Sequence, residues 1–307
     1  MSDREPWPAM TYDEWAPTRQ TLHLYVQMIG KLKLALHPPL PQWLHTALLL
    51  DARGFATGPL PAGKRLVSAG IDVTEGALRL CTSDGGAAEI ALTDGRSVAG
   101  VWADFRAALT ALGVEADLWD KPQELPDATP FAADTRDRRF DPAQAQRYHH
   151  LLCRTNSIFE EFRAPFFGRS GVQFWWGAFD LTVLLFNGRP AVAPDDRGYI
   201  MKYDLDAEHL NAGLWPGDAA SPQPLFYAYL HPRPDGCATV PIEPEKAGWV
   251  EAMGEWLLPY DEVRASTDPR RLVLAFLNSV YRVAVGIGGW DEQAHRYQAP
   301  PPPARPA

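Results

Sequence analysis

The side chains best suited to bind a small ligand occur in two parts of the chain. In the first part, His23, Gln27 and Lys31 are spaced four residues apart, so on a helix they would share one stripe. His45 follows just before a short apolar segment and would add an imidazole to one face of a sheet. The stripe faces either solvent or a cleft, and the largely apolar circumference of this helix leaves both open.

In the second part, two arginines stand among aromatic residues in the segment FRAPFFGR, residues 162–169. A guanidinium group captures a carboxylate or phosphate in a planar, bidentate manner, and aromatic walls strengthen that contact by excluding water. Arg163 and Arg169 therefore suggest an anionic ligand. The alternative is that they form structural ion pairs with Glu160, Glu161 or Asp180.

A strand predicted directly after these arginines carries further polar and aromatic side chains. Residues alternate between the two faces of a strand, so Gln173 shares a face with Trp175, and Trp176 shares one with Asp180. One of these faces must meet the core. The candidate ligand-binding residues are His23, Gln27, Lys31, His45, Arg163, Arg169, Gln173, Trp175, Asp180 and Glu208.

No motif assigns a catalytic residue, a cofactor or an oligomeric state. Glu208 and His209 have side chains that suit zinc or iron, but no HExxH or HxH spacing is present, so we assign no metal site. No GxSxG elbow occurs. The cysteines Cys81, Cys153 and Cys237 are far apart and form no CxxC pair, which is typical of free thiols in a reducing compartment.

Composition narrows the class of protein. A chain of 307 residues with 46% hydrophobic and 22% charged residues can bury a large core. The chain has a formal net charge of −9 and no stripe of basic residues, so neither nucleic acid nor an anionic membrane is an expected partner. The first residues lack the pattern of a signal peptide and no apolar run is long enough to span a membrane, so we expect a cytoplasmic protein.

Apolar periodicity predicts an α+β protein of two similar halves, each a helix, an antiparallel meander and a second helix. The halves are residues 1–120 and 141–292, joined by a Pro- and Asp-rich linker, 121–140, that should lie along the surface. Residues 293–307 form a Pro-rich tail that we expect to be disordered. The predicted segments are helices 18–36, 97–113, 141–167 and 270–286, strands 43–50, 65–73, 77–83, 87–93, 172–190 and 225–231, and an inserted helix at 248–260.

The repeated order of elements suggests a duplication in which the halves are related by a pseudo-twofold axis. Such an arrangement creates a cleft between equivalent elements where ligands tend to bind. The alternative is a coincidence between two generic α+β halves.

Several sequence blocks resemble an uncharacterised bacterial family, the domain of unknown function numbered five-nine-nine-six. The blocks are TLHLYVQMIGK at 21–31, FRAPFFGRSGVQFWWGAFDL at 162–181, GRP at 188–190, NAGLWPG at 211–217, FYAY at 226–229 and LLPY at 257–260, with Trp15, Thr18, Trp43, His45, Trp290 and Asp291. The resemblance spans nearly the whole chain and implies no particular activity. It implies a His and a Pro where this chain has Gln173 and Gly171, so a mechanism that needs that His does not carry over.

Two functions from different classes fit the sequence. The first is a small-molecule-binding protein or enzyme that acts on a small polar or anionic ligand in a cleft between the halves. The second is a non-catalytic interaction or structural module, in which the same blocks form core and interface, because no complete catalytic constellation is present.

Overall fold

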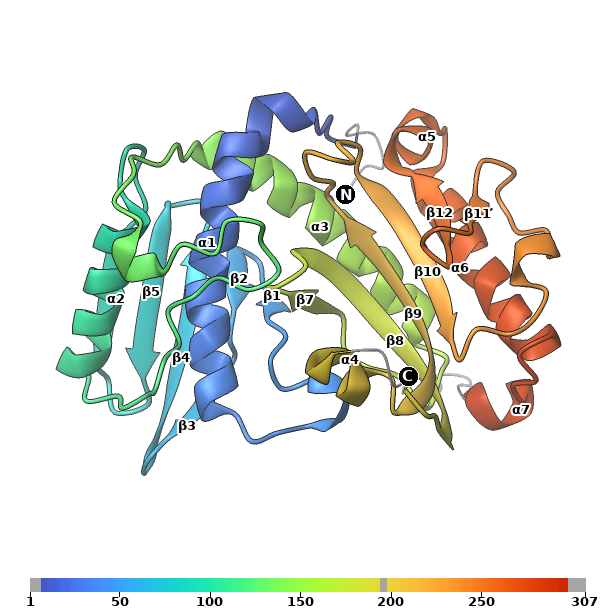
Figure 1. Cartoon of the computed structure of the whole chain (residues 1–307), viewed down its shortest axis with the longest axis horizontal. Helices are drawn as coiled ribbons and strands as arrows, with labels where there is room; N and C mark the ends of the chain where they lie inside the picture. The colour runs from blue at the N-terminus through green and yellow to red at the C-terminus, as the bar shows by residue number, and fades with distance from the viewer. Residues whose placement is uncertain (1–6, 194–197, 298–307) are drawn as a thin grey trace, which may run out of the picture.

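The computed structural model describes residues 7–193 and 198–297, which form two six-stranded antiparallel sheets with helices packed on them (Figure 1). This confirms the predicted α+β class. No helix in the described ranges is long and apolar enough to cross a membrane.

The first sheet follows chain order, β1-β2-β4-β5-β6, with β3 paired to β4. Its strands are β1 Leu49–Leu50, β2 Gly54–Ala56, β3 Leu60–Ala62, β4 Arg65–Asp72, β5 Ala77–Thr82 and β6 Ala87–Ala91, and its helices are α1 Tyr12–Leu36, the 3-10 turn η1 Pro41–Trp43 and α2 Val98–Ala111.

The second sheet has the order β11-β12-β10-β9-β8-β7. Its strands are β7 Gln173–Trp175, β8 Asp180–Pro190, β9 Ala207–Trp215, β10 Leu225–His231, β11 Gly248–Val250 and β12 Glu255–Pro259. The 3-10 turn η2 Phe131–Ala133 lies in the segment that joins the halves. The helices that follow it are α3 Pro142–Arg163, α4 Tyr199–Asp204, the 3-10 turn η3 Cys237–Thr239, α5 Tyr260–Ala265, α6 Pro269–Gly286 and α7 Glu292–His295.

Local signals account for the helix ends. The Ser97 side chain accepts a hydrogen bond from the backbone N–H of Gly100, and the Asp141 side chain accepts one from Ala143, so each satisfies a donor that the first helical turn leaves free. Ser97 is the N-cap of α2. Gly113 follows this helix at a φ of 61°, as expected for a glycine beyond a helix C-terminus.

The two sheets meet edge to edge. Leu48, just before β1, and Phe174 in β7 exchange two backbone hydrogen bonds of 2.8 and 2.9 Å. The ring of Phe174 lies 4.5 Å from that of Phe55 across this junction. One hydrophobic core runs through both halves.

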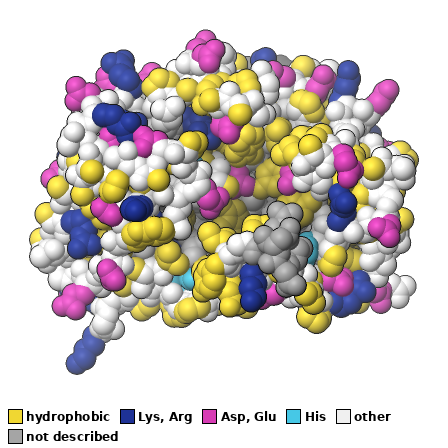
Figure 2. All heavy atoms as spheres, in the orientation of Figure 1, with side chains coloured by type: hydrophobic (Ala, Val, Ile, Leu, Met, Phe, Trp, Pro, Cys, Tyr) yellow, Lys and Arg dark blue, Asp and Glu magenta, His cyan; other side chains and the backbone are white. Residues whose placement is uncertain are grey.

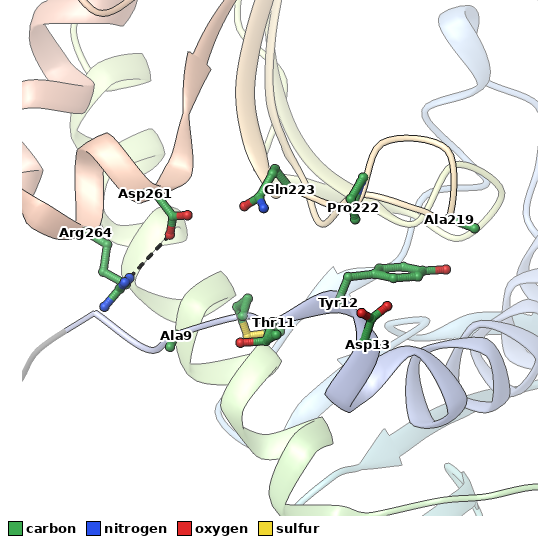
Figure 3. A pocket seen from close by; sticks show the side chains of 10 residues that line it. Ala9, Thr11, Tyr12, Asp13, Ala219, Pro222, Gln223, Asp261 and Arg264 are labelled. Atoms are coloured by element: carbon green, nitrogen blue, oxygen red, sulfur yellow. Dashed lines mark hydrogen bonds and ion pairs between the residues drawn. The ribbon is translucent and has the colours of Figure 1, made fainter.

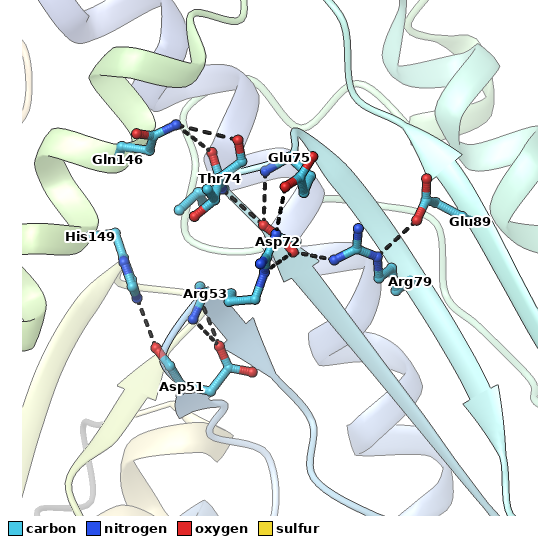
Figure 4. A network of polar contacts seen from close by, with 11 residues as sticks. Asp51, Arg53, Asp72, Thr74, Glu75, Arg79, Glu89, Gln146 and His149 are labelled. Carbon is cyan, nitrogen blue, oxygen red and sulfur yellow. Dashed lines mark hydrogen bonds and ion pairs between the residues drawn. The ribbon is translucent and has the colours of Figure 1, made fainter.

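A buried carboxylate fixes the turns of the first sheet (Figure 4). Asp72, which is 5% exposed, accepts hydrogen bonds from Arg53 and Arg79 and from two backbone N–H groups in the turn after β4. Close by, His149 of α3 donates to the backbone carbonyl of Asp51 over 2.9 Å. Helix α3 is thereby attached to the first half.

Helix α1 is enclosed by protein along most of its length. It crosses in front of the first sheet in Figure 1 and has buried residues on every side from Thr18 to Lys33. Gly30 lies against the indole of Trp176, where an added Cβ would come within 2.4 Å of ring atoms. The absence of a side chain at this position allows helix and indole to approach each other closely.

Several segments differ from the sequence predictions. The single strand predicted at 172–190 is two antiparallel strands, β7 and β8, because the chain turns at 176–179. The prediction of an inserted helix at 248–260 is wrong, because this segment forms the hairpin β11–β12. Its aromatic and β-branched residues favour strands, and Gly254 occupies the turn with a φ of 72°. Of the strand predicted at 43–50, only Leu49–Leu50 is extended, because η1 occupies its start. Residues 293–297, assigned to the tail, include the end of α7 and a bridge from Arg296 to Phe166, while 298–307 lie outside the described residues.

The segment predicted to be a surface linker, 121–140, lies largely at the surface, but a few of its residues are buried. Phe131 is fully buried and Asp134 is 3% exposed, and Asp134 pairs with Arg136 and Arg138. Local ion pairs and one aromatic anchor hold the segment against α1 and α2, which a composition argument could not anticipate.

We expect Gly30→Ala to destabilise the protein by about 1–3 kcal/mol, because the new methyl group collides with the Trp176 indole. This loss should exceed the gain of up to about 1 kcal/mol that alanine brings to a helix. Urea unfolding measures the change. The control is Gly286→Ala at the exposed end of α6, where an added Cβ meets nothing within 4 Å; equal stabilities of the two variants would contradict the close contact.

Candidate ligand-binding site

A cavity of about 400 Å³ lies on the face of the second sheet that α4 and η1 partly cover. In Figure 2, a hollow near the centre of the molecule exposes hydrophobic surface with acidic side chains beside it. The aromatic lining comes from Trp43, Trp119, Trp175, Trp176, Tyr199 and Tyr227. We call this space the aromatic cavity.

Asp180, at the start of β8, is the most deeply buried charged group in its wall. The side chain is 5% exposed; one carboxylate oxygen accepts a hydrogen bond from the Tyr227 hydroxyl, and the other, Oδ1, has no partner in the described structure. Burial raises the pKa of Asp180 to about 7, although the Tyr227 hydrogen bond opposes this rise. An unsatisfied buried acceptor is costly unless a ligand or water meets it.

The strand register explains how Tyr227 reaches Asp180. Tyr227 in β10 is directly opposite Gly213 in β9, and a Cβ on that glycine would come within 2.6 Å of several atoms of the tyrosine ring. The ring therefore lies flat across β9 and places its hydroxyl on β8. A side chain at position 213 would block this path.

Two further carboxyl groups line the cavity. Burial, with a smaller effect of the nearby carboxylates of Asp206 and Glu124, raises the pKa of Asp204 to about 6. Burial also raises the pKa of Glu124, whose backbone has a φ of 57°, a conformation uncommon outside glycine. Among the residues that line the cavity there is no lysine or arginine. The lining is thus aromatic and acidic.

A buried ammonium lies against the same aromatic wall. The Nζ atom of Lys31 has no hydrogen-bond partner within the described ranges and lies 4.8 Å from the ring centroid of Trp119 and 5.4 Å from that of Trp176. Phe131 is the third ring around it, at 5.8 Å. Burial lowers the pKa of Lys31 to about 8. These rings therefore already present their faces to one cation.

A second cavity lies beside the N-terminal end of α1 (Figure 3). It has a volume of about 400 Å³ and lies between the start of α1 and α5. Of its charged groups, Asp261 and Arg264 pair with each other at 3.5 Å, and both are largely exposed to solvent. This exposure makes it a weaker candidate than the aromatic cavity.

A model of one protein family matches residues 7–297, and its description is a family of unknown function, DUF5996. The chain belongs to this family. Neither the curated proteins nor the solved structures gave a match. The match covers the whole of both sheets, so it supports the resemblance seen in the sequence and leaves the function of the DUF5996 chain open.

The polar stripe on α1 of this DUF5996 protein is buried and supports the cavity from behind. His23 donates from Nε2 toward the carbonyl oxygens of Trp176 and Gly177, both at 2.9 Å, and burial lowers its pKa to about 3. Gln27 exchanges two 2.8 Å hydrogen bonds with the backbone of Gln123. The stripe does not line the aromatic cavity: it positions the segments that form the walls of this cavity.

Other predicted residues also act on the walls. Trp175 lines the cavity and donates to the Thr182 hydroxyl over 2.7 Å. Gln173 donates to the carbonyl of Leu44 over 3.3 Å, while its Oε1 lacks a partner. His45 accepts from the backbone N–H of Leu40 and lies beside the Trp43 ring. Of the predicted residues, Trp175 and Asp180 are the two that line the cavity.

Arg163, Arg169 and Glu208 lie apart from it. Arg163 pairs with Glu160 at 2.7 Å, as the ion-pair alternative expected, and Arg169 donates to the carbonyls of Phe166 and Phe167. Glu208 pairs with Arg189 at 3.1 Å. The guanidinium groups at the end of α3 are therefore occupied by protein partners.

Sequence reasoning missed Tyr227, Asn211 and the acids Glu124 and Asp204. The strand signal could have found the first two, because polar residues alternate with apolar ones in NAGLW and FYAY and mark one sheet face. The two acids come from a linker and from a short helix, where no period exists to mark a face.

We expect Asp180→Asn to stabilise the ligand-free protein by about 1–3 kcal/mol at pH 8. The folded pKa, about 7, lies above the ordinary value of 3.8, so the stability contributed by Asp180 is present at low pH and is lost as the pH rises through 7. Asparagine retains an acceptor for Tyr227 and carries no charge.

Urea unfolding at pH 8 and pH 5 measures this effect, which should be much smaller at pH 5. The exposed Asp137→Asn serves as the control and should change stability little at either pH. A variant Asp180→Asn that is less stable than the wild type at pH 8 would show that the carboxylate has a structural role.

Proposed function

We propose that this protein binds a small molecule with a cationic head, either a protonated amine or a quaternary ammonium, and an apolar body. The observation that carries the proposal is the free Oδ1 of Asp180, buried in a cavity with six aromatic residues in its wall. A cation there would satisfy the carboxylate while ring faces surround it. The proposal concerns binding and assigns no reaction.

The charge of the cavity favours a cation over an anion. Asp180, Asp204 and Glu124 all have pKa values raised by burial, so each would be more easily ionised beside a positive charge. An anion would meet these carboxylates without a lining lysine or arginine to balance them. The arginines that suggested an anionic ligand, Arg163 and Arg169, do not line this cavity.

The cavity also bears on the proposed duplication. We interpret the chain as two related halves, because each begins its sheet with a short strand and these first strands, β1 and β7, meet as an antiparallel edge pair through Leu48 and Phe174. An edge contact between equivalent strands is what a twofold axis produces. The cleft of the duplication hypothesis then corresponds to the cavity beside this junction, which both halves line.

A protein partner is the second candidate. Tyr199, Ile200 and Trp119 line the cavity and are 70%, 45% and 56% exposed, which is unusual for large apolar side chains. A partner that inserted a lysine or arginine into the cavity could cover them. The three free thiols are consistent with our proposal of a cytoplasmic location.

We expect tryptamine and phenethylamine to raise the melting temperature of the protein, whereas indole-3-propionate and 3-phenylpropionate, which replace the amine by a carboxylate, should not. Asp180→Asn should weaken amine binding at least tenfold, because a charged hydrogen bond contributes about 1.5–3 kcal/mol. Calorimetric titration measures the affinities.

The matched control is Tyr227→Phe, which retains the carboxylate and removes only its hydroxyl partner, so amines should still bind. Tighter binding of the carboxylates than of the amines would overturn the proposal. If no small amine binds but a lysine-containing peptide does, with the same loss in Asp180→Asn, the partner-protein candidate is supported instead.

We further expect amine affinity to rise as the pH increases from 5 to 7 and then to level off. Below its pKa of about 7, Asp180 is protonated and must release a proton to bind the cation, so affinity changes by up to about tenfold per pH unit. Titrations in buffers of different ionisation enthalpy report this proton release. Asp204 and Glu124 titrate nearby, so Asp180→Asn should retain a shallower slope; an unchanged slope would exclude Asp180 as the partner.

A further inference from the structure

A third cavity, of about 520 Å³, adjoins the aromatic cavity. The two share Glu124 and Ala178 in their walls. The rest of its lining comes from the first half of α1, from the segment that ends near Arg138, and from the loop after β9. We call it the Arg19 cavity, after the arginine of α1 that lines it.

Arg19 is a buried guanidinium without a protein partner. It is 6% exposed, its Nε atom has no hydrogen-bond partner, and it joins no hydrogen bond or ion pair within residues 7–193 and 198–297. Its contact is with the ring of Phe179, whose centroid lies 5.4 Å from the guanidinium carbon. A guanidinium carries five N–H donors in a fixed plane, and burying them unused is costly.

The other charged groups of this cavity already have partners. Arg136 bonds to both Asp127 and Asp134, and Arg138 bonds to Asp134. Asp218 accepts two 2.8 Å hydrogen bonds from backbone N–H groups of its own turn.

Glu124 and His23 complete the titratable groups in this wall. Burial raises the pKa of Glu124, and His23 is neutral because burial lowers its pKa to about 3. The Nε atom of Arg138 also lacks a hydrogen-bond partner, but its guanidinium is held by Asp134. Among the described residues that line the cavity, Arg19 is therefore the charged donor with neither a hydrogen bond nor an ion pair.

We propose that the Arg19 cavity is a binding site for an anionic oxygen group, a carboxylate or a phosphate, held in a bidentate manner by the Arg19 guanidinium. The planar fork of arginine matches the two oxygens of either group. The Phe179 ring, whose centroid lies 5.4 Å from the guanidinium carbon, covers one side of the group and excludes water there. The proposal does not depend on a cation occupying the aromatic cavity.

The test is calorimetric titration of the full-length protein with inorganic phosphate and, separately, with acetate, at constant ionic strength. The wild type should bind at least one of them in a saturable, one-to-one manner, and the preferred ion distinguishes phosphate from carboxylate. Arg19→Met, which keeps an apolar side chain against Phe179, should weaken this binding at least tenfold. Arg19→Lys, which keeps the charge without the fork, should fall between the two.

Two controls make the result specific. Arg282→Met removes the same charge from the exposed face of α6 and should bind the anion as the wild type does. Asp180→Asn should also retain anion binding, so that a failure of the aromatic site is separated from a failure of this one.

Stability distinguishes a ligand-binding arginine from a structural one. Arg19→Met should melt at the same temperature as the wild type or higher, because it removes a buried charge without a partner. Absence of saturable binding of both ions, wild-type affinity in Arg19→Met, or unfolding of Arg19→Met would each overturn the proposal.

Discussion

The packing of helix α1 against the turn after β7 is the constraint on which the candidate site depends. His23 holds the carbonyls of Trp176 and Gly177, and Gly30 allows the Trp176 indole to lie on the helix surface. One helix face thus fixes the position of an indole, of a turn and of the first residue of β8. The aromatic cavity is built outward from this contact, which explains why a helix with so many polar side chains is buried on all sides.

Several unpaired polar atoms lie in or beside the walls of the two cavities. Lys31, Asp180 and Asn211 each have a buried polar atom without a hydrogen-bond partner in the described structure, and so has Arg19. Such atoms are few in most folded proteins, because each one costs stability. Others, such as those of Thr155, Trp256 and Tyr281, lie away from both cavities, so the cavities account for only part of the set.

Much of the fold could be predicted from the sequence because apolar periodicity and helix caps act locally. The predicted helices with strong caps at Ser97 and Asp141 are present, and so are the strands with alternating residues at 65–73 and 225–231. The hairpin at Gly248–Pro259 was not predicted, since its apolar residues fit a helix as well as a strand until a partner strand is known.

The candidate site was predicted only in part. Asp180 and Trp175 were found because they belong to the apolar segment 172–190, which was predicted to be extended. The polar stripe on α1 was found by its spacing, although it supports the aromatic cavity rather than lining it. Glu124 and Asp204 line the cavity because segments that are distant in sequence contact each other. Residue spacing along the chain cannot predict such contacts. The guanidinium groups of Arg163 and Arg169 looked available only because their neighbours in space were unknown.

The wall that the aromatic cavity and the Arg19 cavity share has one last consequence. Glu124 faces both spaces, so a charge placed in either one changes the ionisation of a group that the other also experiences. Solutes bound in the two cavities would then be thermodynamically linked through the ionisation of Glu124. Such linkage is reciprocal: each ligand changes the binding free energy of the other by the same amount.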